Sequence, residues 1–208
     1  IQQEEAAFIV GRQGSTKRKV ARAAGVDMNI ETETQELTIR GYPENVAHAE
    51  EYVKFVCDQR VGQISLDLSN GGRTDATAVQ VPANTVGFLM GKHGRTLRSM
   101  EEEWGTLMFF AKTSPEDPVE RLCIFGPFRG RRGARFKVYS AVEHKEPGFC
   151  AKNGELMEPP KIPGDEDPEG FGVTTHPLSG DDYSYALGSK GTVRKKLAAA
   201  SGCILEYV

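Results

Sequence analysis

A glycine frame occurs three times along this chain, and it constrains the fold more than any other feature of the sequence. The pattern G-x-x-G stands at GRQG (11–14), GKHG (91–94) and GSKG (188–191). In each copy another glycine follows 14 residues after the first, at Gly25, Gly105 and Gly202. One G-x-x-G is common by chance, but three copies with the same downstream glycine predict three repeats of one structural unit.

Each copy of the frame predicts two helices joined by a tight turn at the G-x-x-G. The apolar residues just before it, such as Phe8, Ile9 and Val10, are typical of a short helix that the glycine terminates. Ser, Thr and basic residues crowd the start of the next helix. The downstream glycine stands where a C-terminal helix cap needs positive φ. The apolar alternation after it, as at Val26 and Met28, predicts a strand.

Further strands and helices complete the unit. QELTIRG (35–41) and ERLCIFG (120–126) predict strands, and a helical pattern follows each of them. ATAVQVPAN (76–84) predicts a leading strand that ends at Pro82. VGQISLDL (61–68) either finishes a helix or forms an extra strand. The expected class is α+β, with the unit order β-α-α-β-β-α and the G-x-x-G between the first two helices.

The repeats predict the domain organisation. The second linker contains five prolines and an acidic cluster, so we expect it to be extended and mobile. The third copy has 11 residues from Pro177 to Gly188, against nine in the second copy, which predicts a longer or irregular first helix. In chain order we expect a first unit at 1–68 that lacks its first strand, a linker at 69–74, a complete unit at 75–144, a linker at 145–172 and the N-terminal part of a third unit at 173–208.

The charge is distributed unevenly. The formal net charge is −3, which argues against a globally basic nucleic-acid binder. The segment 11–24, however, carries five basic residues and no acidic one. Basic side chains at a helix N-terminus oppose the helix dipole, so folding alone gives no reason to gather them there. A bound anion gives that reason, because free N–H groups and the positive helix end attract phosphate.

The second copy resembles the KH domain family in its eukaryotic, type I form. VPANTVGFLMGKHGRTLRSMEEEWGTLMFF (81–110) is similar to the family pattern V-P-x-x-x-V-G-x-h-h-G-x-x-G-x-x-h-x-x-h-x(4)-G-x-h-x-h, where h is apolar. Lys17 and Arg194 depart from it in the other two copies, since the family usually has an aliphatic residue there. The resemblance implies tandem type I KH units, each with a three-stranded antiparallel sheet packed on three helices, the outer two being truncated.

The resemblance also implies a ligand and the residues that bind it. In the family, the loop and its flanking helices bind the backbone of about four single-stranded nucleotides, whose bases lie along an apolar groove. No loop carries an acidic residue, so all three are expected to be competent. The implied nucleic-acid-binding residues are Gly11, Arg12, Gln13, Gly14, Lys17, Arg18, Gly91, Lys92, His93, Gly94, Arg95, Arg98, Gly188, Ser189, Lys190, Gly191, Arg194 and Lys195. The implied groove residues are Ile9, Val20, Met28, Leu89, Leu97, Met100 and Met108, for which helix packing is the alternative.

Two further features have structural interpretations beside functional ones. The fourth G-x-x-G, GRRG (130–133), lacks the downstream frame, so it predicts the basic start of a helix, with an accessory phosphate contact or an RG-type patch as the alternative. Trp104 precedes the cap glycine and is expected to be a packing anchor, the alternative being a platform for base stacking.

The sequence favours a non-catalytic protein without metal or cofactor. GFLMGK (87–92) is one residue shorter than a phosphate-loop motif, and His93 stands where that motif has Ser or Thr after its Lys. The four histidines lack metal-ligand spacing, and no apolar run approaches the roughly 18 residues of a membrane helix. The four widely spaced cysteines indicate reduced thiols of a cytoplasmic or nuclear protein.

The expected partner is therefore single-stranded RNA, or single-stranded DNA, in post-transcriptional RNA regulation. The alternatives are a scaffold that uses the same fold for protein contacts and an accessory module of a nucleic-acid enzyme. Strand binding should weaken steeply with salt, whereas a protein contact through the groove should not.

Overall fold

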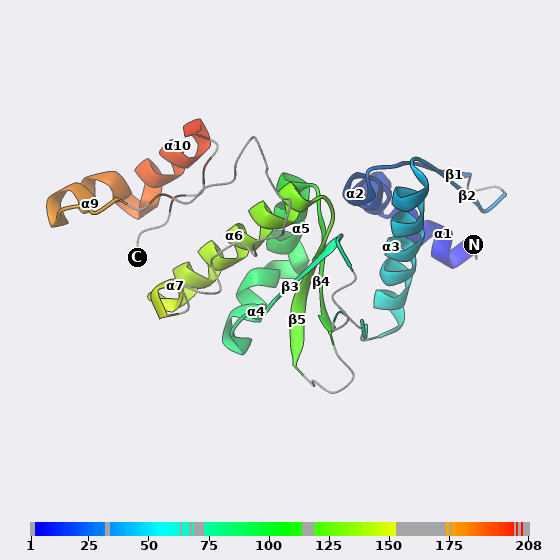
Figure 1. Cartoon of the computed structure of the whole chain (residues 1–208), viewed down its shortest axis with the longest axis horizontal. Coiled ribbons are helices and arrows are strands. Elements are labelled where there is room, and N and C mark those ends of the chain that lie inside the picture. The colour runs from blue at the N-terminus through cyan, green and yellow to red at the C-terminus, as the bar shows by residue number, and fades with distance from the viewer. Residues whose placement is uncertain are drawn as a thin grey trace. The chain divides into compact units, whose positions relative to one another are not determined.

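The computed structural model (Figure 1) divides into two compact units, Ile1–Arg135 and Phe136–Val208. The boundary falls inside helix α6 (Phe128–Lys145). The structure describes residues 3–31, 34–62, 64–66, 68, 73–113, 119–152, 174, 176–201, 203 and 205.

The first repeat folds as a helical hairpin, two strands and a long helix. The strands pair antiparallel, with Met28 opposite Ile39. Pro43 starts the long helix, where its missing N–H costs no hydrogen bond. The order agrees with the predicted unit from its first helix onward. The elements are α1 (Gln3–Val10), α2 (Ser15–Ala24), β1 (Asp27–Glu31), β2 (Glu36–Arg40) and α3 (Pro43–Val61).

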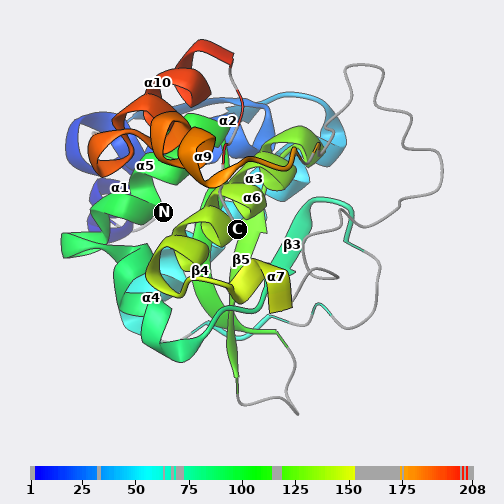
Figure 2. The same ribbon diagram turned by 90° about the vertical axis from the view of Figure 1, so that its left-hand side faces the viewer.

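The second repeat has the full order β-α-α-β-β-α. Its three strands form one antiparallel sheet in the order β3-β5-β4, and they run side by side in Figures 1 and 2. The predicted three-stranded sheet and the leading strand ahead of Pro82 are confirmed. Before α6, the elements are β3 (Ala76–Val79), α4 (Ala83–Met90), α5 (Arg95–Trp104), β4 (Leu107–Lys112) and β5 (Glu120–Phe125).

The downstream glycines cap the second helix of each repeat in unit 1. Gly25 has φ 69° and Gly105 has φ 65°, both in the left-handed region that glycine enters without a Cβ clash. The N–H of Gly25 returns to the carbonyls of Ala21 and Arg22, which closes the helix end. The predicted caps are confirmed at both positions, while Gly202 lies outside the described residues.

The sheet of the second repeat is buried on both faces. Leu107, Phe109 and Ala111 share a core cluster with α3, and the ring of Phe55 lies 5.8 Å from that of Phe109 and 5.3 Å from that of Phe125. Met108 of β4 is also buried, although it alternates with those residues. Figure 1 shows α3 on one side of the sheet and α4 and α5 on the other. The two repeats therefore share one hydrophobic core.

A short extended segment adds to the β4 edge of this sheet. The N–H of Leu66 donates to the carbonyl of Lys112 at 2.7 Å, and the N–H of Lys112 donates to the carbonyl of Ile64 at 3.1 Å. Ser65 forms a parallel bridge with Lys112. Of the two alternatives for 61–68, Val61 ends α3, and the described residues 64–66 pair with the sheet edge through one isolated bridge, which satisfies backbone groups that an edge would expose.

The described part of the second unit contains the end of α6 and the α-helices α7 (Phe149–Lys152), α9 (Gly180–Leu187) and α10 (Thr192–Ser201). The sequence predicted an extended segment from Lys145 onward, and this is wrong for its first residues, since α6 and α7 include most of them. The Glu143 carboxylate accepts the N–H groups of Gly148 and Cys150 at 2.6 and 2.8 Å, which stabilises the turn into α7. Residues 153–173 lie outside the described part.

Helix α9 corrects the expectation of a longer or irregular helix in the third copy. It has eight residues, as α1 and α4 do. Ser179 is its N-cap, and the Ser179 hydroxyl accepts the N–H of Asp182. The extra residues of this copy therefore lie before the helix rather than within it.

Candidate nucleic-acid interface

The three G-x-x-G loops have nearly the same backbone conformation. Each forms one turn of 3-10 helix between two α-helices. The first glycine of every loop has φ 66°, and the second has φ between 71° and 73°. The residue between them, Gln13, His93 or Lys190, has φ 53°, 55° or 52°. The repeated frame in the sequence therefore encodes a repeated loop geometry.

The first glycine of each loop is required by the chain itself. Its φ of 66° with ψ near 180° is a region that is essentially restricted to glycine. A Cβ at Gly91 would lie 2.1 Å from Thr96 Oγ1, and a Cβ at Gly11 would lie 2.2 Å from Thr16 Oγ1. Folding therefore requires these glycines with or without a ligand, and binding must be argued from the residues beside them.

The residue ahead of the second glycine is held in the left-handed region although it has a side chain. Gln13, His93 and Lys190 all have this conformation, which costs about 1 kcal/mol for a residue that is not glycine. All three side chains are exposed. Strained positions that recur on a surface are typical of binding sites.

The loops are electropositive. Arg12, Lys92 and Lys190 are exposed, and the helix after each loop has no acidic residue in its first turn. The positive end of each helix dipole adds to these charges. In the first loop, Arg18 Nη1 donates to the carbonyl of Gln13 at 2.7 Å, so this side chain also fixes the loop.

The seven predicted groove residues belong to the core. Every one of them is at most 6% exposed, which favours helix packing, the alternative for such spacing. That any of them contacts a base stays a prediction. Leu97 and Met108 also line the pocket described below.

An aromatic residue, Phe8, Phe88 or Tyr185, stands three positions before every loop and is not among the predicted binding residues. The exposed fractions are 39% for Phe8, 40% for Phe88 and 81% for Tyr185. The neighbouring Ile9 and Leu89 are fully buried. The aromatic position therefore faces outward beside the loop, where a base could stack on it. Its constant offset in all three repeats was the signal in the sequence.

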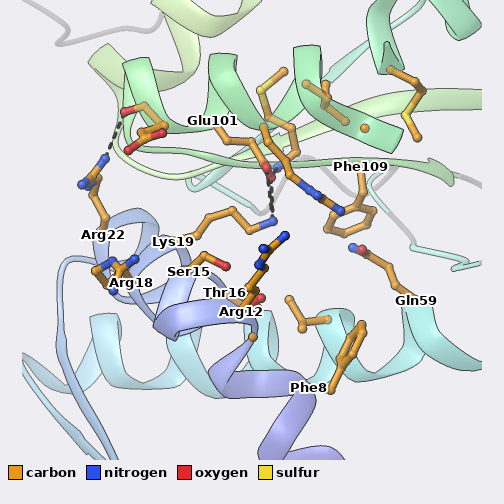
Figure 3. Close-up of a pocket in the computed structure, with 18 of the residues that line it drawn as sticks. Phe8, Arg12, Ser15, Thr16, Arg18, Lys19, Arg22, Gln59, Glu101 and Phe109 are labelled. Atoms are coloured by element: carbon orange, nitrogen blue, oxygen red, sulfur yellow. Dashed lines mark hydrogen bonds and ion pairs between the residues drawn. The ribbon is translucent and has the colours of Figure 1, made fainter. Parts of the chain in front are cut away.

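A pocket of about 850 Å³ lies between the first two repeats of unit 1. Figure 3 shows its lining, with Arg12 and Lys19 below and Glu101 above. Lys19 Nζ lies 3.0 Å from the Glu101 carboxylate, which also accepts the N–H of Met108 at 2.7 Å. Burial raises the pKa of Glu101, and these two partners oppose that rise. Arg22 donates to the carbonyl of Glu102 at 3.0 Å, which adds a second link between α2 and α5.

The fourth G-x-x-G serves helix packing. A Cβ at Gly133 would lie 2.0 Å from the ring of Trp104, and one at Gly130 would lie 2.5 Å from the Trp104 carbonyl. Arg131 is 5% exposed and donates to four acceptors, the carbonyls of Thr74, Ala76 and Gly126 and the hydroxyl of Thr77. For residues 130–133, both observations favour the start of a helix over a phosphate contact. For Trp104, they favour a packing anchor over a stacking platform.

No three His, Cys, Asp or Glu side chains in the described part of the chain are grouped to hold a metal ion. No described helix is both long and apolar enough to cross a membrane. The four cysteines are free thiols.

Comparison with known proteins identifies the family. The KH domain matches residues 1–55 and 76–140, together more than half of the chain. The human and rat far upstream element-binding protein 1 are each 23% identical over 115 residues, which is 53% of this chain and 18% of theirs. The match therefore spans less than a fifth of these relatives.

Solved structures show weaker likenesses. The first type I KH domain of human vigilin is 25% identical, with 40% of this chain and 84% of that chain covered and a TM-score of 0.30. Dim2p from Pyrococcus horikoshii OT3 is 20% identical, with 69% and 95% covered and a TM-score of 0.27. The assignment rests on the family match and on the repeated fold. The chain belongs to the KH domain family, generally non-catalytic RNA-binding domains, and carries these domains in tandem.

Proposed function

We propose that this chain binds single-stranded RNA through its G-x-x-G loops and does so without catalysis. The observation that supports this most is the repetition of one strained loop conformation with an exposed basic side chain at each copy. Loop N–H groups and the positive helix end suit a phosphate oxygen. The exposed aromatic residue beside each loop suits a base. Single-stranded DNA is the alternative ligand.

A role in post-transcriptional RNA regulation, in the cytoplasm or the nucleus, belongs to the same proposal. The four free thiols support a reducing compartment. With a net charge of −3, binding has to come from local charge at the loops. Several weak loop sites on one chain gain affinity when they bind the same strand.

The double variant Lys92→Asp/His93→Asp should weaken RNA binding about tenfold or more, since it reverses the charge of the second loop where phosphate would bind. Aspartate tolerates the left-handed conformation of position 93, so the loop should keep its shape. Fluorescence anisotropy with randomised 12-mers of single-stranded RNA and DNA, at two salt concentrations, measures the effect and the preferred nucleic acid.

The matched control is Lys54→Glu/Gln80→Glu, which changes the charge equally at two exposed positions away from the loops. It should change the affinity less than twofold. Equal affinity of the loop variant and the control would contradict the proposal. Binding that is insensitive to salt would favour the scaffold function instead.

Phe88→Leu should weaken RNA binding about fivefold, because base stacking on an aromatic ring contributes about 1 kcal/mol or more and leucine cannot replace it. The control is Tyr42→Leu, an aromatic residue that is 80% exposed at the start of α3 and far from any loop in the sequence. The same anisotropy titration measures both variants. If they bind alike, the aromatic position beside the loop has no role in binding.

A further inference from the structure

The pocket in unit 1 draws its lining from both of the first two loops and their flanking helices. Gly11 and Arg12 come from the first loop, and Gly94 comes from the second. Figure 3 shows Arg12 extending from its loop into the space below α5, where Lys19 and Glu101 meet. Two loops that are 80 residues apart in the sequence therefore line a single cavity.

The lining suits an anionic ligand. Glu101 and Glu102 are its two acidic residues, and Glu101 is paired with Lys19. Both Arg12 and Arg98 are exposed, and within the described part of the chain neither side chain makes a hydrogen bond, although the Arg98 charge acts on the nearby Glu101 and opposes the rise that burial causes in its pKa. Their guanidinium groups can therefore donate to phosphate oxygens. The basic residues of the lining are Arg12, Arg18, Lys19, Arg22 and Arg98.

The same lining offers apolar surface for a base. Phe8 is 39% exposed and Met90 is 38% exposed, so both present apolar atoms to the cavity. Leu97, Met108 and Phe109 also line the cavity and are buried. A volume of about 850 Å³ lies in the range of roughly 300–1,000 Å³ that ligand pockets have. Phosphate-binding cations beside aromatic and thioether groups fit a nucleotide within a strand.

The two loops are held at a fixed separation. Lys19 and Arg22 of α2 bind Glu101 and the Glu102 carbonyl of α5, and the two repeats share one core. Two loops fixed around one cavity can contact neighbouring nucleotides of one strand without ordering a linker, which lowers the entropic cost of binding.

We infer that the first and second loops form one shared site, in which a single strand of RNA passes through this pocket, instead of two separate sites. This inference rests on the proposed function. It adds that the two loops bind one RNA strand together and that this RNA strand passes through the pocket. Gln59 provides the test, because it is exposed on α3 and lines the pocket but belongs to neither loop nor to the helices beside them.

The change Gln59→Glu should weaken binding of a fluorescein-labelled six-nucleotide RNA about fivefold, because it adds a negative charge to the cavity through which the phosphates would pass. The matched control, Gln80→Glu, makes the same change at an exposed position that does not line the pocket, and it should stay within twofold. Equal affinities of the two variants would overturn the shared site.

Stoichiometry gives an independent readout. The double variant Ser189→Asp/Lys190→Asp reverses the charge of the third loop, so this loop should no longer bind RNA. Isothermal titration of that variant with the same RNA should give one RNA strand per chain. Two strands per chain would overturn the shared site. Loss of binding in Lys92→Asp/His93→Asp without an effect of Gln59→Glu would overturn the shared site alone, whereas no RNA binding by the unaltered chain would overturn the proposed function as well.

Discussion

Gly133→Ala is expected to destabilise unit 1 by about 3 kcal/mol, at the upper end of the cost of overpacking a core. The added Cβ would lie 2.0 Å from Cε3 and Cζ3 of Trp104 and 2.5 Å from Cδ2. The Gly133 backbone is buried in α6, so neither the ring nor the helix can move without disturbing the packing around it.

Gly87→Ala is the matched control, since it is also a glycine within a helix of the second repeat. Nothing lies within 4 Å of a Cβ at Gly87, so alanine should raise the stability by about 0.5–1 kcal/mol through helix propensity. The two Gly→Ala changes are therefore expected to change the free energy of unfolding in opposite directions.

Urea unfolding followed by tryptophan fluorescence measures both variants. Trp104 is the single tryptophan of the chain and lies at the altered contact, so its emission reports on unit 1 directly. The midpoint for Gly133→Ala should fall by about 1.5 M urea. An unchanged midpoint would show that α6 does not pack on Trp104 as closely as the structure indicates.

The local structure around the loops could be predicted because glycine encodes it directly. Gly25 and Gly105 adopt the positive φ that the spacing required, and the helices on either side of each loop begin and end where the glycines indicated. The three-stranded sheet followed from apolar alternation and from the resemblance to a family. Features set by nearby residues are those that a single sequence shows most clearly.

The packing between repeats could not be predicted from the repeat pattern. Ile9, Val20 and Met100 have the same spacing whether they line a groove or a core, and only the tertiary contacts decide between the two. The uninterrupted apolar run LMFFA (107–111) did carry a signal, since such runs are typical of strands that are buried on both faces. Helix α7 depends on the Glu143 carboxylate, whose partners are set by the turn at Gly148.

The shared pocket depends on the connection between the two repeats, and a buried carboxylate fixes that connection. Asp75, just before β3, accepts the hydroxyl of Tyr52 at 2.8 Å and binds Arg73 through two hydrogen bonds of 3.0 and 2.7 Å. Arg73 also binds Glu51 of α3 at 2.6 Å. The start of the second repeat is thereby joined to the last helix of the first.

Burial alone would raise the pKa of Asp75, but the hydrogen bonds from Arg73 and Tyr52 outweigh it and hold the pKa below its ordinary value of 3.8. Burial and the Asp75 charge raise the pKa of Tyr52, so its hydroxyl remains a donor. A carboxylate with a lowered pKa stabilises the fold at every pH above its unfolded value, and this contribution is lost as the pH falls through the folded value.

Asp75→Asn should therefore destabilise unit 1 by about 2 kcal/mol at pH 7, because the neutral amide removes one of the two carboxylates that pair with the half-buried Arg73, leaves Glu51 as the other, and turns an N–H₂ group toward the donors of Arg73 and Tyr52. The control Asp58→Asn, which changes an exposed aspartate on α3, should alter the stability by no more than about 0.5 kcal/mol.

Urea unfolding between pH 7 and pH 2.5 measures both variants. The difference in the free energy of unfolding between the unaltered chain and Asp75→Asn should be constant above pH 4 and should shrink below it. Other carboxyl groups titrate in that range, but they are common to both proteins, so the difference isolates Asp75. A gap that stays the same at low pH would mean that the lowered pKa does not stabilise the connection between the repeats.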